Sequence, residues 1–156
     1  MTMAIHRGVG VIVTNPARDR FLVQRKDASY PRFPRGYSLF GGAREQGESD
    51  DAALARELYE ELGDASARAL VDAGLQEIGA FELGERRLVF VLFEAVVADE
   101  MLEVFASRPV FEGERAEVVA RADLRGLAWI WTLAEVIAAY LKGTAGGGAE
   151  PEDGIA

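Results

Sequence analysis

Four acidic residues near the middle of the chain are spaced so that a helix would carry them on one side: Glu57, Glu60, Glu61 and Asp64. Like charges three or four residues apart on a helix cost about 0.2–0.5 kcal/mol per pair. Glu60 and Glu61 would also lie in the last helical turn, where the helix dipole disfavours anions by roughly 0.3–1 kcal/mol each. Such a face is either a solvated acidic surface or a site for a divalent cation, because Mg²⁺ prefers carboxylate and phosphate oxygens.

The helix that carries the three glutamates is predicted over Asp50–Leu62, and Asp64 follows two residues beyond its end. Ser49 is a good N-cap residue, and acidic residues follow it in the first turn, where the helix dipole favours them. Gly63 is a typical residue to end the helix. An apolar stripe at every fourth position, which would face the core, consists of Leu54, Leu58 and Leu62.

An arginine on this helix is placed poorly for an ion pair within the helix. Arg56 precedes Glu60 by four residues, and the opposite order gives the stronger pair. We therefore expect Arg56 to reach back to Glu48 and to fix the preceding loop to the helix.

The spacing over residues 42–63 resembles the Nudix box. Five residues separate Gly42 from Glu48, and seven more precede the run RELYEELG that begins at Arg56. This run matches the pattern G-x5-E-x7-R-E-U-x-E-E-x-G, in which U is a bulky aliphatic residue. The aliphatic position that follows in the family pattern is Asp64 here, which departs from it.

The resemblance implies a fold and a reaction. The fold is α/β, a Nudix-like α/β/α sandwich with a mixed β-sheet, which we expect as one domain over residues 1–142. The reaction is hydrolysis of a phosphoanhydride bond in a nucleoside diphosphate linked to another moiety, with Mg²⁺ or Mn²⁺ as the cofactor.

The resemblance to the Nudix box also implies roles for its residues. The positions that match the family's metal ligands are Glu57, Glu60 and Glu61. Gly42 matches the glycine whose backbone approaches metal and substrate, and Glu48 with Arg56 matches the pair that shapes the loop.

The base that takes a proton from the attacking water is not fixed by the resemblance, because family members take it from the box or from a later loop. Glu114 and Glu117 follow the last long predicted strand and are candidates for a further carboxylate. Glu112 ranks behind them. A solvated acidic loop is the alternative interpretation for all three.

Basic and aromatic residues precede the box. Candidates for contacts with substrate phosphates are Arg25, Lys26, Arg32 and Arg35. Candidates for stacking on a base are Phe33, Tyr30 and Tyr37, although a packing role is the simpler interpretation for each. Trp129 and Trp131 are interpreted as core or interface residues.

The elements that must position these residues follow from apolar patterns and turn residues. Strands are predicted over 8–13, 21–24, 75–82, 87–97 and 117–120, a short apolar element over 38–40, and a second helix over 132–141. The turn over 15–19 predicts a hairpin, residues 26–37 a loop, and the two glycines at 41–42 the end of the short element. The Gly-rich residues 143–156 predict a disordered tail.

Composition excludes several classes of function. The net charge of −9 argues against binding to polymeric nucleic acid, and no apolar run is long enough to span a membrane. The chain has no cysteine, which excludes thiolate zinc sites and speaks against the isoprenoid diphosphate isomerases, which share the Nudix fold and use a catalytic cysteine. We expect a cytoplasmic protein with a small nucleotide-like partner, and a homodimer is an option because many relatives are dimers.

Two hypotheses about function remain. The first is a pyrophosphohydrolase, for which nucleoside triphosphates or nucleotide sugars are favoured, because residues 39–42 lack the Pro-Lys-Gly pattern that often precedes the box in dinucleoside-polyphosphate hydrolases. The second is a non-catalytic nucleotide-binding sensor on the same fold. Sensors usually lose carboxylates of the box, and this chain retains them.

Overall fold

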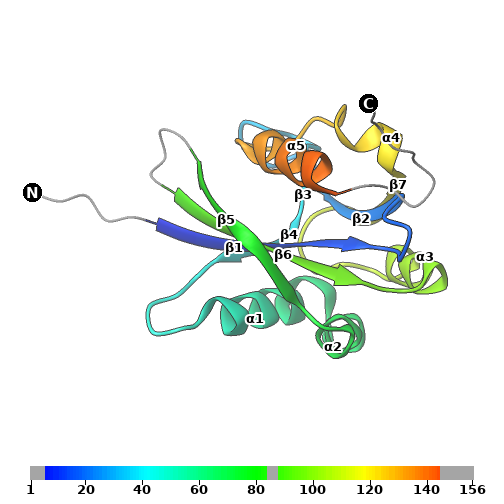
Figure 1. Ribbon diagram of the computed structural model, residues 1–156, viewed down its shortest axis with the longest axis horizontal. Coiled ribbons are helices and arrows are strands. Elements are labelled where there is room, and N and C mark those ends of the chain that lie inside the picture. Colours follow the sequence, from blue (N-terminus) through cyan, green and yellow to red (C-terminus); the bar gives the residue numbers. More distant parts are fainter. Residues whose placement is uncertain (1–5, 84–87, 145–156) are drawn as a thin grey trace, which may run out of the picture.

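The computed structural model describes residues 6–83 and 88–144, which form one mixed sheet between two layers of helices (Figure 1). The strands are β1 (His6–Thr14), β2 (Arg20–Arg25), β3 (Tyr37–Ser38), β4 (Phe40–Ala43), β5 (Gln76–Leu83), β6 (Leu88–Val96) and β7 (Arg115–Ala120). The helices are α1 (Asp50–Leu62), α2 (Asp64–Ala73), α3 (Asp99–Ser107), α4 (Arg121–Leu124) and α5 (Leu133–Gly143). None of the helices described is long and apolar enough to cross a membrane.

Strand β1 is the centre of the sheet. It pairs in parallel with β6 along its whole length, and β6 pairs with the edge strand β5. The opposite edge of β1 is shared: its first half pairs antiparallel with β4, and its last residues pair antiparallel with β2. β2 in turn pairs with β3 and β7. β4 and β2 pair with successive parts of the same edge of β1. The segment that follows β4 and the segment that follows β2 therefore lie beside each other at this side of the sheet.

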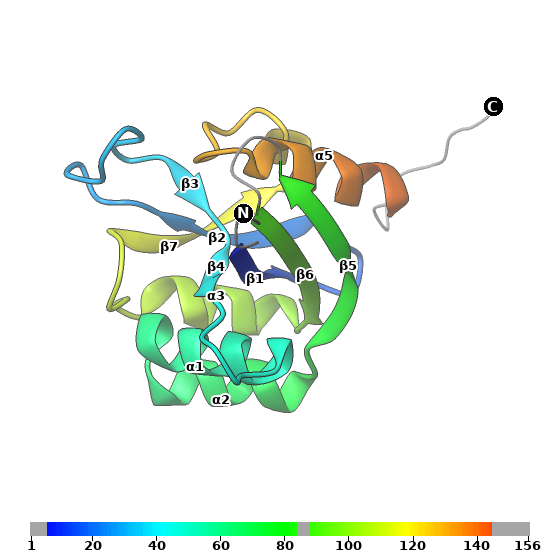
Figure 2. The same cartoon turned by 90° about the vertical axis from the view of Figure 1, so that its left-hand side faces the viewer.

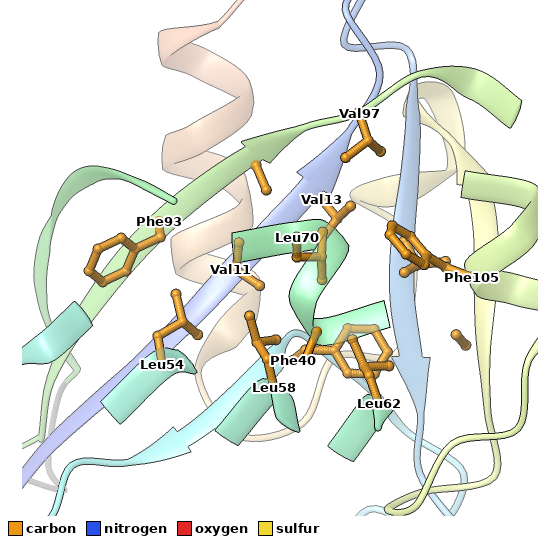
Figure 3. Packing of buried hydrophobic residues seen from close by; sticks show 14 of the residues in the cluster. Val11, Val13, Phe40, Leu54, Leu58, Leu62, Leu70, Phe93, Val97 and Phe105 are labelled. Carbon is orange, nitrogen blue, oxygen red and sulfur yellow. The ribbon is translucent and has the colours of Figure 1, made fainter. Parts of the chain in front are cut away.

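Side chains that alternate along β1 enter two separate cores. Val11 and Val13 lie in the core beneath α1, α2 and α3, which Figure 3 shows from close by, whereas Ile12 packs in the core beneath α5. Figure 2 shows the same three layers from the side. This arrangement is the predicted α/β/α sandwich, and it follows from the period of two of a β-strand.

Helix α1 has the predicted bounds and caps. The Ser49 hydroxyl accepts a hydrogen bond from the Ala52 N–H at 3.1 Å, and Gly63 ends the helix with φ of 83°. Leu54 and Leu58 are completely buried against the sheet. The local rules of capping and apolar spacing were therefore sufficient to define this helix.

Several predictions about the other elements were wrong. Gly41 and Gly42 do not stop a strand, because β4 continues through them to Ala43 by pairing with β1. Helices α2 and α3 were not predicted. In the case of α2, the helix begins directly after Gly63, and a glycine at this place signals the end of a helix. Gly143 belongs to α5 and not to a tail, and the rest of the predicted tail beyond Thr144 lies outside the described residues.

Candidate active site

Two glycines in β4 bring the helix of carboxylates close to the sheet. The N–H of Gly41 donates a hydrogen bond to the Glu61 carboxylate at 3.1 Å. A Cβ atom on Gly42 would lie 2.5 Å from the carboxylate carbon of Glu57, and a Cβ on Gly41 would lie 2.1 Å from the backbone oxygen of Val9. A side chain at residue 42 would displace the Glu57 carboxylate, and a side chain at residue 41 would clash with the backbone of β1, so the close approach depends on both glycines.

The carboxylates of α1 lie in different environments. Glu61 is 1% exposed, and this burial raises its pKa to about 9, with a further contribution from the charge of Glu112. Burial also raises the pKa of Glu57, against the opposing effect of Arg56. Glu60 is turned to solvent, with 58% of its side chain exposed. The predicted metal ligands therefore comprise one buried acid, Glu61, one partly buried acid, Glu57, and one exposed acid, Glu60.

Arg56 fixes the loop to the helix in the way that the sequence predicts. Its Nε donates to one oxygen of Glu48 at 2.7 Å and its Nη2 to the other at 3.0 Å, which lowers the pKa of Glu48 to about 2. Nη2 also donates to the backbone oxygen of Ala43 at 3.0 Å. On the other side, Nη1 contacts Glu57 at 3.1 Å and Glu60 at 3.4 Å. One guanidinium thus joins β4, the loop and α1.

A further acid, Glu112, lies in the connection between α3 and β7, next to Phe111, whose N–H donates to the backbone oxygen of Glu61. Glu112 raises the pKa of both Glu61 and Glu57 through its charge, and it forms an ion pair with the Lys26 ammonium at 3.2 Å. Lys26 is 7% exposed and lies over the ring of Tyr30 at 4.9 Å. From the sequence, Glu112 ranked behind Glu114 and Glu117, yet the fold places Glu112 beside α1.

The two acids that the sequence favoured have other partners. Glu117 accepts from the Tyr37 hydroxyl at 3.0 Å and lies 3.6 Å from Arg25, and Glu114 lies 3.2 Å from Arg35. The antiparallel pairing of β7 with β2 and of β2 with β3 brings these five residues together. Arg25 and Arg35, which were predicted to bind phosphate, therefore form ion pairs with Glu117 and Glu114, the two predicted bases.

The remaining candidates from the loop over 26–37 surround Trp131. The Phe33 ring lies 4.8 Å from the Trp131 ring, and the Arg32 guanidinium lies 4.8 Å above it. The Trp131 N–H donates to the Tyr30 hydroxyl at 3.3 Å. Phe33 and Arg32 thus have a packing role in this structure, and Trp131, which was interpreted as a core or interface residue, lines the adjacent cavity.

A cavity of about 790 Å³ lies over β4 and the N-terminal half of β1. Its polar lining includes the backbone of Gly41 and Gly42 together with Lys26, Glu112 and Arg44. Its apolar lining includes Leu39, Leu83, Leu88, Phe90, Ile130 and Leu133. The cavity is large enough for a nucleotide-sized ligand, with a charged end at the glycines and an apolar wall.

A family model described as the NUDIX domain matches residues 4–141, which is most of the 156-residue chain. The chain belongs to the NUDIX domain family. It is a Nudix-type hydrolase, and the activity of such hydrolases is directed at nucleoside diphosphates linked to another moiety. No curated protein sequence matches the chain.

Solved structures share the Nudix fold with this chain. A MutT/Nudix family protein from Listeria innocua is 19% identical, with 91% of this chain and 95% of that chain covered and a TM-score of 0.69. The dihydroneopterin triphosphate pyrophosphohydrolase of E. coli is 16% identical, with 88% and 96% covered and a TM-score of 0.58. The NUDIX domain of Shewanella oneidensis NrtR, in complex with ADP ribose, is 17% identical, with 92% and 91% covered and a TM-score of 0.64. At these identities the likeness shows the fold.

Proposed function

We propose that this Nudix hydrolase cleaves a phosphoanhydride bond of a small nucleotide-like substrate with the help of a divalent cation, Mg²⁺ or Mn²⁺. The observation that carries the proposal is that Glu57 and Glu61 of α1 lie against Gly42 and Gly41, which line the cavity together with Glu112. The charge of Glu112 raises the pKa of both Glu57 and Glu61, so the site carries an excess of negative charge, which a bound cation would neutralise.

The chemistry of these donors fits a hard cation, which prefers carboxylate oxygens. Among the described residues, no group of three acidic or histidine side chains is close enough to hold a metal in its present arrangement. Glu57 and Glu60 are turned to Arg56, and Glu61 accepts from Gly41. We therefore propose that Glu57 leaves Arg56 to bind the cation with Glu61, while Arg56 keeps its two hydrogen bonds to Glu48.

A bound cation would lower the pKa of a water molecule and neutralise charge on the diphosphate. The residues of the chain supply the surroundings for this chemistry. Lys26 is a buried cation that can meet a phosphate oxygen, and the β4 glycines let the substrate approach the backbone. Glu112 is half exposed and faces the same space, so it is our candidate for the further carboxylate that assists the reaction.

The substrate class that we favour is a nucleoside triphosphate or a nucleotide sugar. Two relatives of the same fold support it: one is named for hydrolysis of dihydroneopterin triphosphate, and another was solved with ADP ribose. The combination of a charged end and an apolar wall in the cavity also fits a molecule that joins a diphosphate to a ring. The cytoplasmic location and the homodimer stay predictions.

The test is a panel of nucleoside triphosphates, nucleotide sugars and ADP ribose, incubated with Mg²⁺ and examined for release of monophosphate or pyrophosphate. We expect turnover of at least one member, its loss with EDTA, and a loss of more than about 100-fold in Glu57→Gln, because a cation ligand acts on the transition state directly. Glu82→Gln, which changes an exposed acid of β5, is the matched control and retains full activity.

The same panel separates the enzyme from the alternative, a nucleotide-binding sensor. A sensor would bind a panel member in calorimetry but would turn over no member with either Mg²⁺ or Mn²⁺. This result would overturn the enzyme hypothesis. The carboxylates Glu57 and Glu61 on α1 are the reason for favouring the enzyme. Burial raises the pKa of both, which destabilises the fold, and a sensor has no need for such acids.

A further inference from the structure

Phe111 is the most exposed large apolar side chain among the described residues, at 70% exposure, yet it makes a specific contact with the end of α1. Its backbone N–H donates to the backbone oxygen of Glu61 at 2.8 Å. Its ring lies against Gly63, where a Cβ atom would come within 2.7 Å of the ring. Phe111 therefore occupies the space that the glycine at the end of α1 leaves open.

The residues after Phe111 are attached to β2. The side-chain amide of Gln24, a buried residue, donates to the backbone oxygen of Glu112 at 3.1 Å. The N–H of Glu114 donates to the backbone oxygen of Arg25 at 2.7 Å, and a Cβ on Gly113 would lie 2.8 Å from that oxygen. The connection between α3 and β7, which Figure 2 draws in yellow-green, is thus anchored to α1 on one side and to β2 on the other.

Glu112 lies between these two anchors. Its side chain is 54% exposed and has an ion pair with Lys26 at 3.2 Å, so packing restrains it little. Long exposed side chains lose about 1.5–2 kcal/mol of rotamer entropy when they are held in one conformation. The position of the carboxylate consequently depends on where the backbone of residue 112 is held, and hence on both anchors.

We propose that Phe111 is a positioning residue, which holds the Glu112 carboxylate beside the C-terminal end of α1 by placing its ring on Gly63 and its N–H on the backbone oxygen of Glu61. The inference rests on the proposed function, because it assigns Glu112 to the site of the cation. It explains why an apolar ring stays exposed beside the site: the ring sets the distance between the loop and the helix. Removal of the ring would leave the helix intact and let the loop move.

The experiment measures binding of Mn²⁺ alone by titration calorimetry, together with kcat and KM for the best substrate of the panel. We expect Phe111→Ala to weaken Mn²⁺ binding about 5–10-fold and to lower kcat by a similar factor, with little change in KM. Glu112→Gln is expected to have the same effects. The double variant Phe111→Ala with Glu112→Gln should be no worse than Glu112→Gln alone, because Phe111→Ala acts only through the carboxylate that Glu112→Gln removes. Phe111→Leu, which retains an apolar side chain on Gly63, restores most of the affinity.

Ile78→Ala is the matched control, because Ile78 is also an exposed apolar residue, at 43%, on the edge strand β5. It is expected to bind Mn²⁺ like the unchanged protein. Two outcomes would overturn the positioning role while the proposed function stands. In the first, Phe111→Ala leaves the Mn²⁺ affinity and kcat unchanged. In the second, the effects of Phe111→Ala and Glu112→Gln add in full. Absence of Mn²⁺ binding by the unchanged protein would overturn both.

Discussion

Replacement of Glu61 by glutamine should stabilise the protein in the absence of metal. Glu61 is 1% exposed, and burial raises the pKa of its carboxyl group to about 9, compared with an ordinary value of 4.5. The proposed function requires this carboxylate to be ionised in order to bind the cation, and the protein interior disfavours that charge. Glutamine has nearly the same shape and carries no charge, so it isolates this cost.

The magnitude follows from the difference between the two pKa values. Because the pKa of Glu61 is higher in the folded protein than in the unfolded chain, its contribution to stability is complete below about pH 4.5 and is lost as the pH rises toward 9. Each unit between 4.5 and neutral pH corresponds to about 1.36 kcal/mol, so the loss reaches about 3 kcal/mol near pH 7. Glutamine can still accept from the Gly41 N–H, but its buried amide NH₂ offsets about 1 kcal/mol or more. We expect a net gain of about 1–2 kcal/mol in the free energy of unfolding.

The assay is urea unfolding, followed by tryptophan fluorescence in EDTA, at several pH values from about 5 to 8.5. The difference between Glu61→Gln and the unchanged protein should be close to zero or slightly negative at the lowest pH and should grow with pH. Glu60→Gln is the control on the same helix, because 58% of that side chain is exposed, and its stability should change by less than about 0.5 kcal/mol. A Glu61→Gln variant that is less stable at every pH, or a difference that does not depend on pH, would refute this reasoning and make Glu61 a structural residue.

Gly42→Ala should lower kcat more than about 100-fold with little change in Tm. A Cβ at residue 42 would lie 2.5 Å from the carboxylate carbon of Glu57, so the new methyl group would push this carboxylate aside. An active variant would contradict the close approach of β4 and α1. Tyr140→Phe should lower the free energy of unfolding in urea by about 1–2 kcal/mol, since the Tyr140 hydroxyl donates to the buried Glu94 carboxylate. Arg18 lowers the pKa of Glu94, so this pair stabilises the protein above the ordinary pKa of a glutamate and the effect is lost as the pH falls through the lowered value. Glu94→Gln should therefore flatten the decline of Tm between about pH 5 and pH 3, and an unchanged acid profile would contradict the ion pair.

The sequence by itself determined the helix of the box and its immediate surroundings. Ser49, the apolar stripe on α1 and Gly63 act through neighbours within four residues, so their effects can be predicted without the fold. Arg56 and Glu48 are eight residues apart in one loop and helix, and their pairing could also be predicted from the local sequence. The α/β/α sandwich was implied by the resemblance of this segment to the Nudix box, and the alternation of apolar residues in β1 agrees with it.

Only the tertiary structure decided which distant residues meet the box. Glu112 is 86 positions from Lys26, and their contact exists because the connection before β7 is anchored between α1 and β2. The pairing of β7 with β2 also places Glu117 beside Arg25 and away from the cavity lining. A shift of one residue in that pairing would turn every side chain of β7 to the opposite face of the sheet. Strand register depends on packing over the whole sheet, so no local pattern in the sequence could distinguish Glu112 from Glu117.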